Sequence, residues 1–254
     1  MLHIRVMPCL LLQSGRLVKT INFKKPNYVG HPVNAVKIYN DKEVDELVFL
    51  DISATKDGKI DFNKIREIAS VCFMPLTYGG GVRSIEDMKK IYSLGVEKII
   101  ICTYAVENPE FITKAAKIFG SQSVVVAIDT KKNLWEKDEV FIHSGSEGSK
   151  LDPVEFARMM EVSGAGEIFL NSIDREGTFL GYDTDLIKKI AKAIKIPLIV
   201  CGGAKNISDF KKAVKNGASA VAAGSMFVYF RNNLDGVLIN YPSREVLKEI
   251  REYE

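Results

Sequence analysis

Residues 76–87 read LTYGGGVRSIED, and residues 198–209 read LIVCGGAKNISD. In each stretch a short apolar run ends in adjacent glycines, and a Ser or Asn then precedes an acidic residue by three positions. An apolar run bounded by glycine indicates a buried strand, and Ser or Asn before an acid at that spacing is typical of a helix N-terminus. Each stretch therefore predicts a strand, a tight turn and a helix.

The similarity between the two halves extends beyond these stretches. Further matches pair residues 94–96 (LGV) with 216–218 (NGA), 102–103 (CT) with 224–225 (GS), and 49–51 (FLD) with 169–171 (FLN). An internal repeat at nearly half the chain length is a strong signal of duplicated architecture. The chain of 254 residues is therefore expected to consist of two fused halves with similar folds.

Strands and helices alternate along the whole chain. Short apolar runs predict buried parallel strands at residues 4–10, 47–50, 75–78, 98–101, 124–128, 167–170, 198–200 and 220–223. Apolar residues at three-to-four spacing predict helices at residues 34–42, 62–70, 85–94, 109–118, 153–162, 184–193, 207–215 and 243–253. Such alternation predicts an α/β fold with one domain over residues 1–254, a single (β/α)8 TIM barrel built from two fused (β/α)4 half-barrels.

Two segments interrupt the alternation, and both leave the expected carboxyl end of a strand. Residues 12–31 predict a long loop after the first strand, and residues 131–145 predict a small hairpin after the fifth. Barrel active sites lie at this end of the strands. Each segment is therefore a candidate lid, with an ordinary surface loop as the alternative.

The composition limits the possible partners. With 46% hydrophobic and 26% charged residues and a net charge of +3, the chain indicates neither nucleic-acid nor membrane-surface binding. Its four cysteines form no CxxC pair, so no zinc site or disulfide scaffold is expected, and free thiols are typical of a reducing compartment. No membrane-length apolar run or signal-peptide pattern is present, so we expect a cytoplasmic protein; no metal or cofactor is predicted.

The two glycine-rich turns are candidate phosphate sites. Glycine lets backbone N–H groups approach an anion without a Cβ clash. One strand later each half carries a hydroxyl residue, Thr103 in the first half and Ser225 (after Gly224) in the second. One such turn alone could be a tight strand–helix connection. Two at repeat-related positions predict a phosphorylated small-molecule ligand, and one that carries two phosphates.

The candidate acid is Asp129, at the end of the fifth predicted strand, where a carboxyl group is well placed for general acid–base chemistry. Its alternative role is to cap a helix or anchor a loop. The repeat places Leu11 at the equivalent position of the first strand, and leucine cannot transfer a proton. The other charged candidates near this mouth are Lys19, Asp51 and Asp174.

Several motifs resemble one family over nearly the whole chain. They are residues 45–52 (DELVFLDI), 105–109 (AVENP), 119–122 (FGSQ), 125–129 (VVAID) and 174–178 (DREGT). On these motifs the chain resembles HisF proteins, the cyclase subunits of imidazole glycerol phosphate synthase. The resemblance implies a barrel that receives ammonia from a HisH-like glutaminase subunit at one end and uses it on a substrate at the opposite mouth.

The resemblance also implies roles for individual residues. The ammonia gate of the family falls on Arg5, Glu46, Lys98 and Glu167, for which a structural salt-bridge cluster is the alternative. Its phosphate contacts fall on Gly81, Thr103, Gly202, Gly203, Gly224 and Ser225, and its substrate-positioning lysine on Lys19. Its two catalytic aspartates fall on Asp129 and on Leu11. Two more departures, Cys102 for Asn and Asn171 for Thr, lie at the same mouth and put the cyclase reaction in question.

After the first strand the chain also resembles a divergent branch of this family. The shared features are residues 10–12 (LLL) and residues 15–20 (GRLVKT). That branch is associated with acetamidino groups on sugars of bacterial surface polysaccharides. The resemblance implies a glutaminase partner and a separate sugar-amidating enzyme.

Three functions follow from these residues. The chain is an ammonia-handling synthase subunit for sugar amidination, a genuine cyclase of histidine biosynthesis, or a non-catalytic ammonia conduit or scaffold. The cyclase would use Asp129 alone or with a substitute acid such as Asp51.

Overall fold

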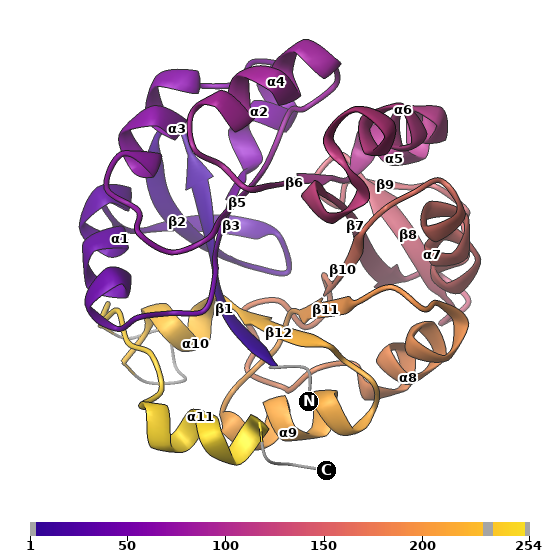
Figure 1. The fold of residues 1–254 in the computed structure, drawn as a ribbon. Coiled ribbons are helices and arrows are strands. Elements are labelled where there is room, and N and C mark those ends of the chain that lie inside the picture. Colours follow the sequence, from indigo (N-terminus) through magenta and orange to yellow (C-terminus); the bar gives the residue numbers. More distant parts are fainter. Residues whose placement is uncertain (1–3, 231–235, 252–254) are drawn as a thin grey trace.

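Eight parallel strands form a closed barrel at the centre of the computed structural model, which describes residues 4–230 and 236–251 (Figure 1). In ring order they are β1 (Arg5–Gln13), β4 (Leu47–Asp51), β5 (Leu76–Gly79), β6 (Lys98–Ile101), β7 (Val124–Lys132), β10 (Glu167–Ser172), β11 (Leu198–Cys201) and β12 (Ala220–Ala223). Because β12 pairs with β1 and β10 pairs with β7, the ring has no free edge. The predicted TIM barrel is confirmed.

Helices surround the barrel; all but the last long one connect successive strands, and the last follows β12 (Figure 1). The long ones are α1 (Pro32–Asp41), α3 (Phe62–Ala69), α4 (Ile85–Ser93), α6 (Pro109–Phe119), α7 (Pro153–Val162), α8 (Thr184–Ala193), α9 (Ile207–Lys215) and α11 (Arg244–Arg251). These correspond to the eight predicted helices, although the predicted end of the last one, residue 253, lies outside the described residues. Proline begins α1, α6 and α7, where the missing N–H has no intrahelical partner to lose.

Short helices were not predicted, because a single turn shows no apolar periodicity. They are α2 (Ile52–Asp57), α5 (Thr103–Glu107), α10 (Ser225–Val228) and the 3₁₀ turn η1 (Ser121–Ser123). The helices α5 and α10 occupy repeat-related positions directly after β6 and β12. Each of the three α-helical turns begins at the carboxyl end of a barrel strand, so they border the mouth where the site is expected.

The prediction of a long loop at residues 12–31 is wrong. The segment continues β1 and then forms the antiparallel hairpin of β2 (Arg16–Ile21) and β3 (Lys24–Gly30). Four consecutive residues of β2 are buried, so the strand packs against the rest of the molecule and does not project into solvent. Polar residues in and around the turn obscured the apolar pattern of β2, so the sequence did not predict this strand. The predicted hairpin after β7 is confirmed by β8 (Asp138–Ile142), with β9 (Glu147–Gly148) beside it.

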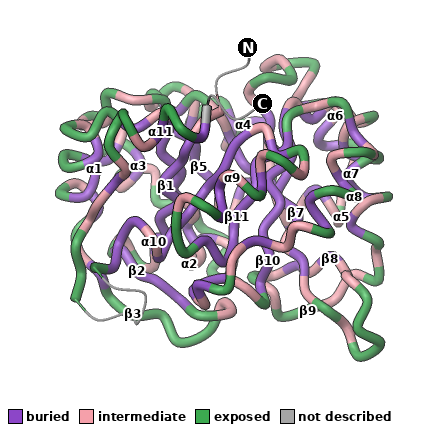
Figure 2. Tube along the Cα trace, turned by 90° about the horizontal axis from the view of Figure 1, so that it is seen from below, coloured by how far each residue is buried: buried purple, intermediate pink, exposed green. Residues whose placement is uncertain are grey.

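Two apolar layers hold the barrel together. The outer layer lies between strands and helices, and the inner layer fills the barrel with side chains such as Met7, Val48, Ile100 and Phe169. Figure 2 shows the buried strands running through the molecule, with the hairpins β2–β3 and β8–β9 at one end. Within residues 4–230 and 236–251, no helix is long and apolar enough to cross a membrane.

Candidate functional site

A cavity of about 130 Å³ opens at the carboxyl ends of the barrel strands. The predicted site residues that line it are Lys19, Asp51, Gly81, Thr103, Asp129 and Asn171. A smaller cavity is lined by the other predicted phosphate residues, Gly202, Gly203, Gly224 and Ser225. Glu176 lines both cavities, so the two adjoin each other. The structure thus gathers residues from both halves of the chain at one mouth.

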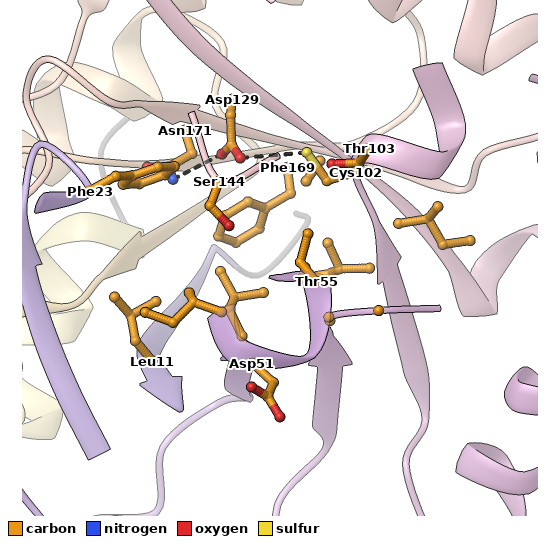
Figure 3. A pocket seen from close by; sticks show the side chains of 18 of the residues that line it. Leu11, Phe23, Asp51, Thr55, Cys102, Thr103, Asp129, Ser144, Phe169 and Asn171 are labelled. Carbon is orange, nitrogen blue, oxygen red and sulfur yellow. Dashed lines mark hydrogen bonds between the residues drawn. The ribbon is translucent and has the colours of Figure 1, made fainter. Parts of the chain in front are cut away.

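Asp129 projects into the large cavity from β7 and accepts hydrogen bonds from two neighbours (Figure 3). Asn171 Nδ2 donates to Oδ1 at 3.1 Å, and Cys102 Sγ donates to Oδ2 at 3.4 Å. Burial raises the pKa of Asp129 to about 6, and the two hydrogen bonds oppose that rise only in part. Burial also raises the pKa of the Cys102 thiol, which keeps it a proton donor. A carboxyl group with this pKa can accept and return a proton near neutral pH.

Leu11 lines the same cavity from β1 and is 6% exposed (Figure 3). Strands β1 and β7 are four steps apart in a ring of eight, so Leu11 and Asp129 approach the cavity from opposite walls. Leu11 pairs in register with Val18 of the hairpin and Leu50 of β4, which leaves it among apolar neighbours. The wall facing Asp129 therefore carries no proton-transfer group at this position.

Asp51 already has a structural task. Its Oδ1 accepts from the backbone N–H groups of Ser53 and Ala54, each at 3.0 Å, and from the Ser53 hydroxyl at 2.6 Å. These bonds make it the N-cap of α2. Asp51 also lines the large cavity, but its capping bonds limit it as a substitute for the missing acid.

Lys19 forms a buried ion pair that the sequence did not reveal. Its Nζ lies 2.9 Å from Glu176 Oε1, and both side chains are more than nine-tenths buried. Burial alone would lower the pKa of Lys19, but the attraction of Glu176 outweighs it and the pKa is raised. Glu176 lies within the motif at residues 174–178, so the motif contained the signal, although Asp174 was chosen from it.

Asp174 itself points away from both cavities. It is exposed, and its Oδ2 accepts from the backbone N–H of Lys132 at 2.9 Å. The side chain therefore anchors the start of the β7–β8 hairpin to the loop after β10. It lies outside the group of predicted residues that the fold brings together.

The turn after β11 admits only glycine at two positions. Gly202 and Gly203 have φ angles of +91° and +103°. A Cβ atom at Gly202 would lie 2.6 Å from the Ser172 carbonyl oxygen, and one at Gly203 would collide with the Gly181 carbonyl oxygen. Ser225, across this turn, has a buried hydroxyl without a hydrogen-bond partner among the described residues. Backbone and hydroxyl together form a cradle suited to an anion.

The turn after β5 also contains glycines with positive φ angles, but its surroundings differ. Gly81 adopts a φ of +70°, and a Cβ there would lie 3.0 Å from the Ala54 carbonyl oxygen. The hydroxyl of Thr103 is also buried, but it accepts a hydrogen bond from the backbone N–H of His143 at 3.0 Å. Both halves therefore keep a glycine-rich turn. In the first half the neighbouring hydroxyl group already has a hydrogen-bond partner in the protein, and in the second half it has none among the described residues.

The four predicted gate residues form a closed ring at the opposite end of the barrel. Arg5 contacts Glu46 at 2.5 Å and Glu167 at 2.6 Å. Lys98 contacts the same two carboxylates at 3.1 and 3.2 Å. Burial alone would lower the pKa of Arg5, but Glu167 and Glu46 outweigh it and raise the pKa. Thr77, an unpredicted member, donates its hydroxyl to Glu46 at 2.6 Å.

An apolar column separates this ring from the large cavity. It consists of inward side chains from the barrel strands, including Met7, Val48, Val125 and Ile199, with the small residues Ala220 and Ala222. The ring of charges therefore closes one end of an apolar interior, and Asp129 and Leu11 stand at the other end.

Comparison with known proteins gives the same picture. A family model described as histidine biosynthesis protein matches residues 5–233. A protein of Leptospira interrogans, provisionally named as the HisF subunit of imidazole glycerol phosphate synthase, is 48% identical over 96% of this chain and 97% of its own length. A protein of Pseudomonas aeruginosa, provisionally named as subunit hisF2 of that synthase, is 48% identical over 95% and 97%.

A third relative, from Endomicrobium trichonymphae, is named imidazole glycerol phosphate synthase subunit HisF without qualification. It is 42% identical over 99% of this chain and 97% of its own length. The family model covers most of the chain, and the relatives align over nearly all of it. The chain therefore belongs to the histidine biosynthesis protein family, as a HisF-like barrel.

Proposed function

We propose that this chain is the ammonia-accepting synthase subunit of a glutamine amidotransferase that forms acetamidino groups on a surface-polysaccharide sugar. A HisH-like glutaminase would supply the ammonia, and a separate sugar-amidating enzyme could receive it. The observation that carries the proposal is the contrast between the two ends of the barrel. The charge ring is complete, whereas Leu11 stands opposite Asp129 where a second acid would be expected.

The ring is suited to admit a small neutral molecule. Each of its two cations touches both of its carboxylates, so every charge keeps a partner if one contact opens. Arg5 and Lys98 remain 22% and 18% exposed, so the ring can be reached from outside. Beyond the ring the interior is apolar, which favours neutral ammonia over the ammonium ion.

A partner at this end would find exposed apolar side chains. Phe73, just before β5, is 87% exposed, and Val162, at the end of α7 before β10, is 88% exposed. Both belong to connections that enter the amino-terminal ends of the barrel strands, as the ring residues do. Because β5 and β10 are three steps apart in the ring, the two side chains do not form one patch, and each offers a separate apolar contact at this end. These contacts support a glutaminase that covers the ring and reaches both sides of it.

A specific observation keeps the cyclase of histidine biosynthesis as the second candidate. Asp129 is present, with a pKa of about 6 that suits acid–base catalysis. Loss of one of two general acid–base groups costs roughly 10²–10⁴-fold in rate, which would leave a slow cyclase and not necessarily an inactive one. A conduit without chemistry of its own is the third candidate. It predicts that Asp129→Asn leaves the yield of amidated sugar unchanged in a reconstituted system.

The experiment that separates these functions is an ammonia-dependent cyclase assay with the ribonucleotide substrate of histidine biosynthesis. It compares the wild type with Leu11→Asp and with Leu11→Asn, which matches the size of Asp without its acidity. We expect the wild type and Leu11→Asn to be inactive or at least about 100-fold below a normal cyclase, and Leu11→Asp to regain part of the rate. Turnover by the wild type at a rate normal for cyclases would overturn the proposal.

A further inference from the structure

The two repeat-related cradles differ in the state of their hydroxyl groups. Ser225 is 6% exposed, lines the small cavity with Gly202 and Gly203, and its Oγ has no hydrogen-bond partner among residues 4–230 and 236–251. A buried polar atom without a partner is costly, so its persistence points to a ligand atom that completes it. Thr103 is buried to the same extent, but its Oγ1 already accepts from the backbone N–H of His143.

The turn that carries His143 is seated over the first-half cradle. His143 and Ser144 adopt φ angles of 51° and 54°, an uncommon conformation for residues with side chains. Ser144 lines the large cavity, and a Cβ at Gly145 would lie 3.0 Å from the Phe23 ring of the other hairpin. The backbone of this turn therefore already supplies a hydrogen-bond partner for the Thr103 hydroxyl, which a phosphate would have to compete with or displace.

The charges around the two cradles differ as well. The first-half turn packs against Asp51, whereas the equivalent neighbour of the second-half turn is the neutral Asn171. On the second-half side, Lys19 Nζ lies so close to Gly224 that a Cβ there would collide with it. Lys19 therefore places a buried cation beside the cradle that also holds the unpartnered Ser225 hydroxyl, and its ion-pair partner Glu176 lines the same small cavity. The second-half cradle adjoins an ion pair, whereas the first-half turn adjoins the carboxylate of Asp51, so an anion is less disfavoured in the second half.

Among the described residues that line it, the large cavity lacks a free positive charge that could bind a second phosphate. Three carboxylates line it, Asp51, Asp129 and Glu176, against two cations. Both cations are already engaged: Lys19 lies 2.9 Å from Glu176, and Arg83 lies 3.9 Å from Glu107 at the rim. Apolar side chains make up much of the remaining wall, among them Leu50 and the labelled Leu11, Phe23 and Phe169 (Figure 3). Such a wall suits an uncharged group.

We propose that the ligand is held by a single phosphate, in the cradle of Gly202, Gly203, Gly224 and Ser225, and that the large cavity receives its uncharged body. This deepens the proposed function and rests on it only in taking this mouth as the substrate site. The ligand class is a phosphate monoester whose other end is neutral and partly apolar. The repeat predicts two phosphate sites. Both glycine-rich turns are present, but in this proposal only the second-half turn binds a phosphate.

The test exploits the repeat, because Ser225→Ala and Thr103→Val remove equivalent hydroxyls from the two halves. Inorganic phosphate is titrated into the wild type and both variants by calorimetry. Ribose 5-phosphate and ribulose 1,5-bisphosphate are compared in the same way. We expect one phosphate per chain, about tenfold weaker binding in Ser225→Ala, and less than twofold change in Thr103→Val. The monophosphate and the bisphosphate should bind within about threefold of each other.

Several results would overturn this inference. They are two phosphates per chain, equal losses in the two variants, bisphosphate binding at least about 100-fold tighter than monophosphate binding, or no saturable phosphate binding at all. Circular dichroism of both variants identifies misfolding, and Thr103→Ala, which also removes the hydroxyl group, replaces Thr103→Val if that variant fails to fold. The titration uses neither ammonia nor a glutaminase, so its failure is distinguishable from failure of the proposed function.

Discussion

Asp129 shows how one residue combines position, burial and two hydrogen bonds into a chemical property. Its place at the end of a barrel strand was readable from the sequence, and so was the missing acid at Leu11, because the repeat aligns the two positions. The raised pKa was not readable, since it depends on burial among Asn171, Cys102 and their neighbours. Glu176 was missed for the same reason: only the fold brings it to Lys19.

The raised pKa of Asp129 predicts a pH-dependent stability. The pKa of this carboxyl group is about 6 in the folded state, against an ordinary value of 3.8. Between these two pH values the folded protein keeps a proton that the unfolded chain releases. This contribution to stability is present below about pH 4 and is lost as the pH rises through 6. Asp129→Asn, neutral at every pH, should gain stability relative to the wild type by about 1–2 kcal/mol between pH 4.5 and 8. Urea denaturation at both pH values measures this, and a pH-independent difference would contradict it.

At the scale of elements, the hairpin β2–β3 decides the shape of the mouth. Its strand β2 pairs with β1, and its turn residue Asn22 donates its backbone N–H to the Glu176 carbonyl oxygen at 2.9 Å. Side-chain pattern alone suggested a loop, because the segment is rich in Lys and Gly. Besides its pairing with β1 and β3, β2 contacts the loop after β10, more than 150 residues away, which local sequence does not encode.

This contact can be tested with two glycines in the same backbone conformation. Gly177 has a φ of +77°, and a Cβ there would collide with the carbonyl oxygen of Thr20 in β2. Gly58 has a φ of +64°, with nothing within 4 Å of such a Cβ. Gly58→Ala should cost about 1 kcal/mol of stability through backbone strain alone. Gly177→Ala should cost at least about 2 kcal/mol more in urea denaturation, and equal losses would show that β2 does not press on this loop.

At the scale of the whole molecule, neither half is a closed structure by itself. The first half contributes β1, β4, β5 and β6, and the second contributes β7, β10, β11 and β12. The halves join through the pairs β6–β7 and β1–β12. Separation would open both seams and expose the apolar interior, so each half needs the other.

We therefore expect residues 1–254 to unfold as one domain. In differential scanning calorimetry the calorimetric and van't Hoff enthalpies should agree, because opening either seam exposes the inner apolar layer. Two resolved transitions, one for each half, would show that the halves are independent domains.

By itself, the sequence determined the eight strands, the long helices, the repeat and the absence of an acid at Leu11. Those features depend on local periodicity or on alignment of one half with the other, and both can be read along the chain. Tertiary structure alone decided the hairpin β2–β3, the Lys19–Glu176 pair, the raised pKa of Asp129 and the difference between Thr103 and Ser225. Each depends on atoms brought together from distant segments, where burial and neighbouring charge, which leave no local pattern, set the chemistry.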